Sequence, residues 1–538
     1  MNHDSFRFKP RTQFALIVGA PSILLSYFIM SPLFAAHFHP VDDHEFVAML
    51  SLDYGSTLTR FYTRFFEMSP AAGYPESVHW RPAVWFARTV EVEIFNDRVA
   101  LYFLWRMVLL AALGLFAAGY GRLVVSQLWR GRLSAFGGNL IAVFLGLLTI
   151  STPSLFDVFG RLLPGEMYTL LGLLLWAFAW SHLIKRRSSS LAPRTRYAAC
   201  AYLGLVLMST GKEDALFLWP LAVGFSLPEI RYFASQKFGR TTWTLVFASS
   251  LVWAAAMVQV VYTFIVRGNP LPYQSRSGSG LSEVLSALER IEILPLLGVL
   301  SSVLLCWLGK RCLQGGWRRL ALFLSAVLLL EMLYVSTVPA EAPRYGSVLT
   351  VTGMLLLPLH GALLRDFLKT RGRALQSLGG ALLLGCVLLV PLGAIHQRAN
   401  ITLYRDISND WNSTVGEVAD LADSLGASQI LFVVDPPSQN EIGRWEKTYS
   451  FARFVRTRTS GQQGLFMTVM ESTALNISSE ARAGLQATSV RGVEDAAGDL
   501  FQPRNALNDS GTLCVLYSDS GRDFDDAVHC DFVYRLTL

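Results

Sequence analysis

Three acidic residues stand within four positions of one another near the start of the chain. They are Asp42, Asp43 and Glu45 in the segment HPVDDHEF, residues 39–46, just after an apolar block. Neighbouring carboxylates repel one another, and partial burial at a membrane boundary raises their pKa values further. Such a cluster could act as a general base, hold a divalent cation through Asp43 and Glu45, or do both. The alternative is the solvated start of a helix, with Asp42 or Asp43 as its N-cap.

A lysine and two acids interrupt the apolar sequence in the middle of the chain. Residues 209–220 read STGKEDALFLWP, which places Lys212, Glu213 and Asp214 between two apolar blocks. A charged side chain at membrane depth is costly, so it usually has a functional role or an ionic partner. Lys212 could contact an anionic ligand, and it could equally form an internal ion pair with Glu213, Asp214 or Glu166.

An arginine and a tyrosine occupy a comparable place further along the chain. Arg344 and Tyr345 lie in VPAEAPRYGS, residues 338–347, before another apolar block. The guanidinium group is a planar fork that matches the oxygen atoms of a phosphate. The alternative is an interfacial arginine whose aliphatic part lies along apolar surface. Other charged residues predicted for the same side of the membrane are Arg81, Asp157, Arg161 and Glu166.

These candidates are embedded in an unusually apolar chain. Of the 538 residues, 52% are hydrophobic and only 16% are charged, whereas a soluble domain carries about a quarter charged residues. The apolar residues form blocks of about 18–25 residues, the length of a helix that crosses about 30 Å of hydrocarbon. Because only helices and closed barrels satisfy their backbone in lipid, these blocks predict a polytopic α-helical membrane protein.

About eleven transmembrane helices are predicted on this basis. The fifth and sixth blocks are short and meet around Lys212, so this pair could be counted differently. The predicted spans are residues 12–34, 99–120, 136–155, 166–184, 197–210, 214–229, 242–266, 292–309, 319–337, 347–364 and 376–396.

The basic residues indicate how the chain is oriented. Lys and Arg cluster in alternate gaps between the blocks, and the other gaps are poor in both. Because cytoplasmic loops carry the excess of Lys and Arg, a cytoplasmic N-terminus satisfies every loop. We therefore predict an integral protein of the cell inner or plasma membrane with its site residues on the outer face. These loops account for the net charge of +6, and no basic stripe indicates nucleic acid.

Two regions are predicted to lie outside the lipid on that face. Residues 35–98 form a long loop whose segments, among them PAVWFARTVEVEIF, suit helices lying in the membrane interface. Residues 397–538 are rich in Ser, Asp, Asn and Gly, and QILFVVD, GTLCVLYSD and DFVYRLTL have strand patterns. We predict a transmembrane domain over residues 1–396 and a small extracytoplasmic α/β domain over residues 397–538. Cys514 and Cys530 could form a disulfide there if that side is oxidising.

The arrangement resembles the GT-C glycosyltransferases, multispanning enzymes that use polyprenyl-phosphate sugars, and in particular the aminoarabinose transferase and protein mannosyltransferase type. In that family the first outer loop begins with an acidic pair and a following aromatic residue, and Asp42-Asp43-x-x-Phe46 is similar to this pattern. The second Asp and the additional Glu45 depart from the commonest form, Asp-Glu. The resemblance covers about residues 12–396, rests on short motifs, and implies a GT-C-like arrangement of the helices.

This resemblance also implies how the acids divide their roles. The reaction would be an inverting glycosyl transfer on the outer face of the membrane. Asp42 would be the general base that deprotonates an acceptor hydroxyl group. Asp43 and Glu45 would orient the acceptor or bind a cation, while local chemistry alone would also allow either of them to be the base.

The donor site is implied in the same way. Lys212, Arg344 and Tyr345 are similar to segments of the family that contact the lipid phosphate. Because phosphate is the leaving group, cationic side chains would stabilise its developing negative charge. The implied partners are a polyprenyl-phosphate sugar, a glycan or lipid-linked acceptor and membrane lipid, with a divalent cation as the one cofactor to consider. The remaining candidates for substrate binding are Arg81, Arg161, Glu213 and Asp214.

Two other functions are alternatives to the transferase. A transporter or flippase would need ionisable residues deep in its spans, for which Glu331 and His360 are the main candidates, and two related halves, which the sequence does not show. A non-catalytic assembly protein would leave the acidic cluster without a role. The sequence contains no Walker loop, dinucleotide fingerprint, CxxC pair or nucleophile elbow.

Overall fold

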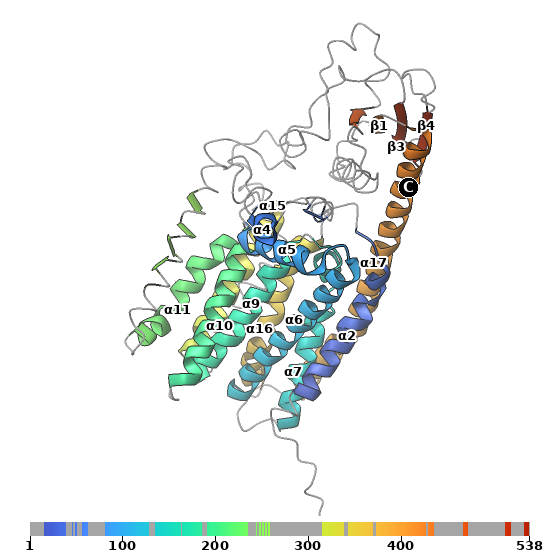
Figure 1. The fold of residues 1–538 in the computed structure, drawn as a ribbon. Coiled ribbons are helices and arrows are strands. Elements are labelled where there is room, and N and C mark those ends of the chain that lie inside the picture. Colours follow the sequence, from blue (N-terminus) through green and yellow to red (C-terminus); the bar gives the residue numbers. More distant parts are fainter. Residues whose placement is uncertain are drawn as a thin grey trace, which may run out of the picture.

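A helical bundle, a long helix and a parallel sheet make up the computed structural model of the chain (Figure 1). The residues that it describes are 15–38, 46, 49–50, 56–62, 81–128, 135–162, 164–185, 191–212, 214–234, single positions between 244 and 258, 315–337, 343–368, 373–426, 429–434, 466–471, 512–517 and 532–536.

Apolar sequence runs form most of the helices of the bundle, and short helical turns connect them. The first elements are η1 (Ala15–Gly19), α2 (Ala20–Met30), η2 (Ser31–Ala35), α4 (Thr57–Tyr62), α5 (Pro82–Phe95), α6 (Val99–Leu128), α7 (Ala135–Ile150) and α8 (Leu155–Phe159). They are followed by α9 (Glu166–Lys185), α10 (Leu191–Thr210), η4 (Asp214–Phe217), α11 (Leu218–Ala234), α15 (Gly316–Thr337), η7 (Pro343–Gly346), α16 (Ser347–Leu368) and α17 (Arg373–Leu425).

The predicted spans can be compared with these helices. Every predicted span overlaps a described helix except 242–266, of which only single positions are described, and 292–309, which lies outside the described residues. Three helical segments in the described part of the chain are long and apolar enough to cross a membrane, and these are Ile17–Ala35, Val99–Leu128 and Glu166–Lys185. Shorter apolar helices are Gly137–Ile150, Ala215–Pro228 and Ser347–Ala362. The chain thus has the architecture of a helical membrane protein, while the count of eleven stays a prediction.

Glycine residues allow α9 and α10 to pack closely. A Cβ atom on Gly172 would lie 2.3 Å from the backbone nitrogen of Met208, and one on Gly204 would lie 2.6 Å from that of Trp176. No larger residue fits at such a helix crossing, and this use of small residues is typical of helix pairs in membranes. The two helices therefore form a close antiparallel pair, which fixes the position of their ends.

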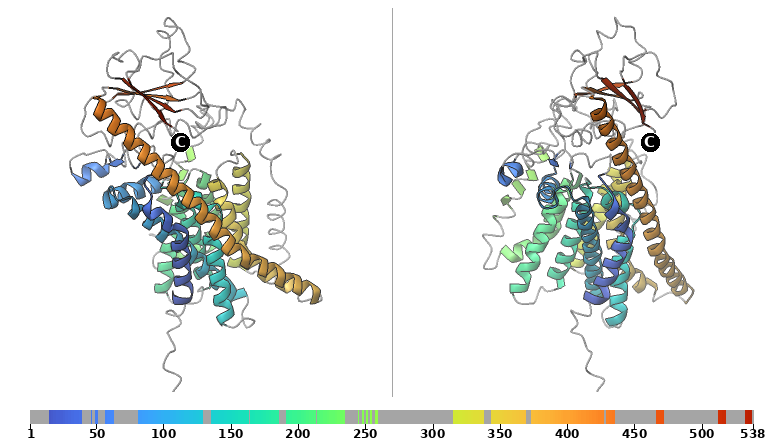
Figure 2. Two further views of the ribbon diagram at one scale, coloured as in Figure 1. Left: turned by 90° about the vertical axis from the view of Figure 1, so that its right-hand side faces the viewer. Right: turned by 45° about the vertical axis from the view of Figure 1, so that its right-hand side comes forward.

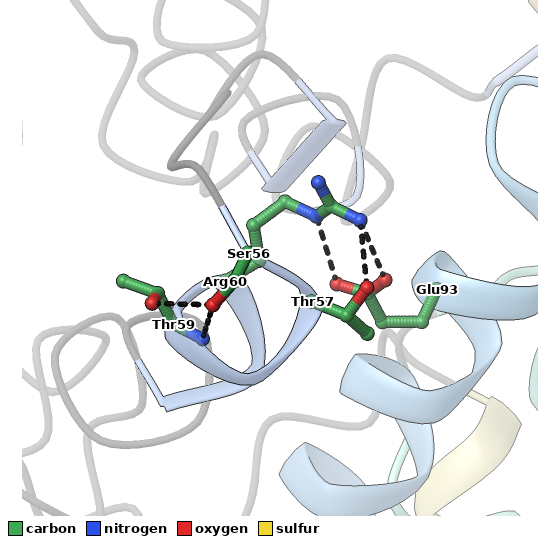
Figure 3. A network of polar contacts seen from close by, with 5 residues as sticks. All are labelled: Ser56, Thr57, Thr59, Arg60 and Glu93. Atoms are coloured by element: carbon green, nitrogen blue, oxygen red, sulfur yellow. Dashed lines mark hydrogen bonds and ion pairs between the residues drawn. The ribbon is translucent and has the colours of Figure 1, made fainter.

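Two helices, α4 and α5, lie at one end of the bundle within the predicted loop 35–98, and α5 has the predicted bounds of PAVWFARTVEVEIF (Figure 1). Arg60 of α4 donates to Glu93 of α5, with the guanidinium Nε 3.4 Å from the carboxylate, and to the hydroxyl group of Thr57 (Figure 3). Large apolar side chains are exposed on both helices. These are Leu58, Tyr62, Phe86 and Ile94.

Helix α17 leads from the bundle to the sheet. It is 53 residues long and contains Pro391, and both views in Figure 2 show it rising along the bundle to the strands. Its first part leaves Leu388, Leu392 and Ile395 exposed, as expected for a surface in contact with lipid. From Gln397 onward polar side chains bind the bundle, beginning with hydrogen bonds from Gln397 Nε2 to the carbonyl groups of residues 150 and 152.

Four strands form a parallel sheet beyond the same end of the bundle as α4 and α5 (Figure 1). Their order is β2-β1-β3-β4, and their apolar runs suit a parallel sheet.

The three strands predicted in the tail are confirmed as β1, β3 and β4, and β2 lies in a segment for which we made no prediction. The chain between the strands lies outside the described residues, so the α/β domain and the Cys514–Cys530 pair stay predictions. The bounds are β1 (Gln429–Val434), β2 (Phe466–Glu471), β3 (Thr512–Tyr517) and β4 (Phe532–Leu536).

Candidate functional site

Helices α9 and α10 meet at a second pair of glycines near the end of the bundle that faces the sheet. A Cβ atom on Gly165 would lie 2.3 Å from the carbonyl oxygen of Gly211, and one on Gly211 would lie 2.8 Å from the backbone nitrogen of Thr169. This close approach places the residues that follow the two glycines side by side. Lys212 Nζ lies 2.8 Å from Glu166 Oε1, and both side chains are buried. The internal ion pair that we considered for Lys212 is therefore confirmed for Glu166.

Arg344 joins this pair from a distant part of the sequence. It lies in η7, the short turn before α16, and its Nε is 4.0 Å from Glu166 Oε1. Its backbone N–H donates to Asp157 Oδ2 at 3.3 Å. Arg81, at the start of α5, also interacts electrostatically with Glu166. Thus one buried carboxylate faces cationic side chains from three separate segments.

A second carboxylate, Asp157 of α8, holds the neighbouring part of the site. Arg161 Nε lies 3.0 Å from Asp157 Oδ1, one helical turn away. The hydroxyl group of Tyr404, on α17, donates to Asp157 Oδ1 at 2.8 Å and accepts from Arg161 Nη2 at 3.1 Å. The guanidinium carbon of Arg161 also lies 5.0 Å from the centre of the Tyr404 ring. Burial raises the pKa of Tyr404, so the phenol stays protonated and keeps donating.

Together these residues form what we call the outer cation cluster. Its charged members among the described residues are four cations and two carboxylates, so cations predominate in this part of the structure. The buried carboxylates hold the cations in place, while the Arg344 and Arg161 side chains are 20% and 19% exposed. Such a site can bind an anion with oxygen atoms, because guanidinium and ammonium groups donate strongly to phosphate and carboxylate. The members are Arg81, Asp157, Arg161, Glu166, Lys212, Arg344 and Tyr404.

The structure brings together four of the predicted site residues and leaves others undescribed. Lys212, Arg344, Arg81 and Arg161 all belong to the cluster. The backbones of Asp214 and Tyr345 lie in η4 and η7, next to cluster members, but their side chains are not described. The residues that lie outside the described part of the chain are Asp42, Asp43, Glu45 and Glu213.

The end of the acidic segment can nevertheless be located. Phe46, the aromatic residue of the acidic motif, is fully buried. Its ring contacts that of Tyr102 edge-on with centroids 5.4 Å apart, and the guanidinium carbon of Arg88 lies 5.8 Å from its centre. Because Phe46 packs between the start of α6 and the middle of α5, the acidic segment ends against the bundle.

Side chains of helix α17 form hydrogen bonds with the backbone that leads into the acidic segment. Asn412 Nδ2 donates to the carbonyl oxygen of Phe38 at 2.9 Å, and Asn409 Nδ2 donates to that of Ala35 at 3.2 Å. The hydroxyl group of Ser408 donates to the carbonyl oxygen of His37. One face of α17 thus contacts the chain just before the acidic segment, and Tyr404 of the same helix contacts the outer cation cluster.

Sequence reasoning missed Tyr404 and the part that α17 plays. Tyr404 lies 247 positions after Asp157, in the segment ANITLYRDIS, which has no motif of a ligand site. The one available signal was the polar sequence that begins at Gln397, immediately after an apolar span. This polar sequence predicted where the membrane domain ends, but it did not predict which residues the side chains of α17 would contact.

A different buried ion pair joins α5 to α6, and we call it the inner ion pair. Arg106 of α6 donates to both carboxylate oxygens of Glu91 of α5, at 2.7 and 2.8 Å, and to the carbonyl oxygen of Leu162 at 2.9 Å. The hydroxyl group of Tyr168 donates to Glu91 at 3.0 Å. This bidentate pair links α5, α6 and α9, and it supports the cluster without belonging to it.

Comparisons with protein-family models, with curated proteins and with solved structures find no match to this chain. Among the described residues, no three His, Cys, Asp or Glu side chains come together as metal ligands would. Asp43 and Glu45, the residues for which we considered a cation, lie outside this set. The function is therefore inferred from the outer cation cluster.

Proposed function

We propose that the protein is a membrane glycosyltransferase of the GT-C type that transfers a sugar from a polyprenyl phosphate to a glycan or lipid-linked acceptor. The observation that carries the proposal is the outer cation cluster, in which Lys212 and Arg344 lie against one buried carboxylate at the end of an apolar bundle. Both residues were selected from the sequence as phosphate ligands, although they are 132 positions apart. Their proximity supports a shared anionic ligand.

A lipid-linked donor fits this location. Its apolar chain would lie among the spans, and its phosphate would reach the cationic side chains at the end of the bundle. The exposed parts of Arg344 and Arg161 would contact the phosphate oxygens. Such a donor also needs no nucleotide-binding fold.

The transfer would use the cluster to stabilise the leaving group. The acceptor oxygen forms a bond to the anomeric carbon while the bond between that carbon and the phosphate oxygen breaks. The electron pair of the broken bond stays on the phosphate, where Lys212 and Arg344 stabilise the added charge. The acceptor proton would pass to Asp42, with Asp43 and Glu45 orienting the acceptor or a divalent cation. Attack from the face opposite the phosphate inverts the configuration of the sugar.

The location of the enzyme is part of the proposal. The excess of Lys and Arg in alternate loops favours a cytoplasmic N-terminus and an outer position for the cluster. The sheet lies beyond the end of the bundle where α4 and α5 lie (Figure 1). We propose that the tail, residues 397–538, is extracytoplasmic and helps to hold the acceptor.

The decisive experiment is sugar transfer by the full chain in nanodiscs with a panel of radiolabelled polyprenyl-phosphate sugars. We expect release of polyprenyl phosphate by the wild type, and a fall in kcat/KM of about 100-fold on Lys212→Met, because a charged donor to the leaving group is removed. Asp42→Asn should abolish transfer with little change in donor binding.

A matched control is available on α9. Lys185 lies at the other end of this helix and contacts Ser126 Oγ at 3.2 Å. Lys185→Met should leave kcat/KM unchanged. If the wild type binds no lipid-linked sugar and releases no polyprenyl phosphate, the transferase proposal fails and transport becomes the leading function. If Lys212→Met and Lys185→Met behave alike, the phosphate site has been assigned to the wrong residues.

A further inference from the structure

Glu166 occupies a central place in the outer cation cluster that the transfer itself does not require. Its Oε1 atom is 2.8 Å from Lys212 Nζ and 4.0 Å from Arg344 Nε, so one oxygen faces both cations. The phosphate of the proposed donor would need the same two donors. A carboxylate held at this point therefore competes with the phosphate for them.

The backbone keeps this carboxylate close to the cations. Glu166 is the first residue of α9 and follows Gly165, whose Cα leaves no room for a side chain against Gly211. Lys212 follows Gly211 directly, so the close approach of α9 and α10 sets the distance between the two charged residues. Arg344 is held through its backbone N–H by Asp157, and its side chain is 20% exposed, whereas that of Lys212 is 5% exposed.

The released polyprenyl phosphate carries more negative charge than the sugar donor, so a carboxylate beside the phosphate site would affect the two differently. The donor is a phosphodiester and carries one negative charge, whereas a phosphate monoester carries about 1.5 to 2 at neutral pH. A cation-rich site would therefore hold the released polyprenyl phosphate more tightly than the donor. Without an opposing charge, the product would leave slowly.

We propose that Glu166 is an internal counter-ion that weakens the binding of the released polyprenyl phosphate and so permits turnover. The inference rests on the proposed function, because it concerns the phosphate subsite of that reaction. In the absence of ligand, Glu166 holds Lys212 and Arg344 together. When the phosphate monoester forms, the negative charge of Glu166 opposes its retention. Glu166 is thus a positioning residue that also sets the affinity for the product.

The test compares binding of farnesyl phosphate by the full chain in nanodiscs for the wild type and Glu166→Gln, with farnesol as the uncharged probe. Removing one negative charge next to the phosphate subsite should tighten farnesyl phosphate binding by about tenfold and leave farnesol unchanged. Glu93→Gln, on α5 and paired with Arg60 outside the cluster, is the matched control and should change neither affinity. In sugar transfer, Glu166→Gln should lower both KM and kcat, with a burst of product in the first turnover.

The outcomes separate this inference from the proposed function. If the wild type does not bind farnesyl phosphate more tightly than farnesol, both fail. If the wild type binds it but Glu166→Gln binds equally or more weakly, only the counter-ion role of Glu166 is overturned. Should Glu166→Gln fail to fold, Lys212→Gln is compared with the double variant Lys212→Gln/Glu166→Gln, in which no unpaired lysine is created. The double variant is expected to bind the phosphate more tightly than the single one, and the opposite order contradicts the inference.

Discussion

Two buried ionic groups in the described part of the chain differ in the geometry of their ion pairs and in the exposure of their side chains. In the inner ion pair, Arg106 and Glu91 share two hydrogen bonds, and their side chains are 0% and 5% exposed. In the outer cation cluster, two carboxylates are set among four cations, and Arg344 and Arg161 are about one-fifth exposed. Both groups lie between helices of the same bundle.

This difference separates a structural role from a binding role. Charges that leave water are costly, and a bidentate pair with further hydrogen bonds offsets that cost within the protein. The inner ion pair is bidentate and has further hydrogen bonds to Leu162 and Tyr168, and it connects α5, α6 and α9. In the outer cation cluster, cations outnumber carboxylates among the described residues and two arginine side chains are partly exposed, so we propose that it binds an anion. The predictions that follow test this distinction.

The largest effect on stability is expected from breaking the inner ion pair. Glu91→Gln leaves the buried Arg106 without its ionic partner and should lower the free energy of unfolding by about 3–5 kcal/mol. The measurement is a denaturant titration in mixed micelles. Glu93→Gln, two residues away on α5 at a partly exposed pair, is the matched control and should cost less than about 1 kcal/mol. Equal losses for the two variants would contradict the structural role of the inner pair.

A side chain between α9 and α10 should disturb the outer cation cluster through the backbone. In Gly211→Ala the new Cβ atom would meet the backbone nitrogen of Thr169 at 2.8 Å and the carbonyl oxygen of Gly165 at 3.1 Å. We expect the helices to separate, at a cost of about 1–3 kcal/mol in unfolding free energy, and farnesyl phosphate affinity to fall. Gly224→Ala is the control, because no atom lies within 4 Å of a Cβ there. Unchanged affinity in Gly211→Ala would show that the glycine contact does not position Lys212.

Removal of one hydroxyl group should have a smaller effect on the cluster. Tyr404→Phe removes the hydrogen bonds to Asp157 and Arg161, and we expect a loss of about 1 kcal/mol in unfolding free energy. Because Asp157 also holds the backbone of Arg344, farnesyl phosphate affinity should fall severalfold. If stability falls while affinity is unchanged, Tyr404 has no part in the binding role of the cluster.

The same residue predicts a pH dependence of stability. The pKa of Tyr404 is raised by burial in the folded chain, whereas that of an unfolded tyrosine is about 10. The folded state therefore binds this proton more tightly. Its contribution to stability is fully present below about pH 10 and is lost as the pH rises through the folded value. The difference in unfolding free energy between the wild type and Tyr404→Phe should be constant from pH 6 to 9 and shrink above about pH 10, and a difference that grows there would contradict this.

The smallest effect is expected at the outer-loop ion pair shown in Figure 3. Arg60 and Glu93 have side chains that are 28% and 15% exposed, and their closest approach is 3.4 Å. Solvent screens such pairs, so Arg60→Ala should lower the unfolding free energy by less than about 1 kcal/mol. Thermal unfolding in detergent is sufficient to measure it. A loss as large as that of Glu91→Gln would mean that the packing of α4 on α5 depends on this pair.

Sequence reasoning located the helices better than the contacts between them. The apolar blocks within the described residues overlap helices, and PAVWFARTVEVEIF has the bounds of α5, because burial of apolar side chains is recorded locally in the sequence. Lys212 was selected because a charge at membrane depth is costly and needs a partner, and Arg344 because its guanidinium group suits phosphate oxygens. The identity of the partner was left open among Glu213, Asp214 and Glu166, since residue types alone do not distinguish them.

The sequence by itself determined that this chain forms apolar helices, that its tail contains strands, and that cations stand at the ends of several spans. These properties follow from hydropathy, local periodicity and the cost of charge near lipid. Only the tertiary structure decided that Glu166 is the partner of Lys212, because the approach of Gly165 to Gly211 depends on how α9 crosses α10. It also brought Tyr404 to Asp157 across 247 positions, since the path of α17 along the bundle is set by the packing of many helices and not by its own sequence.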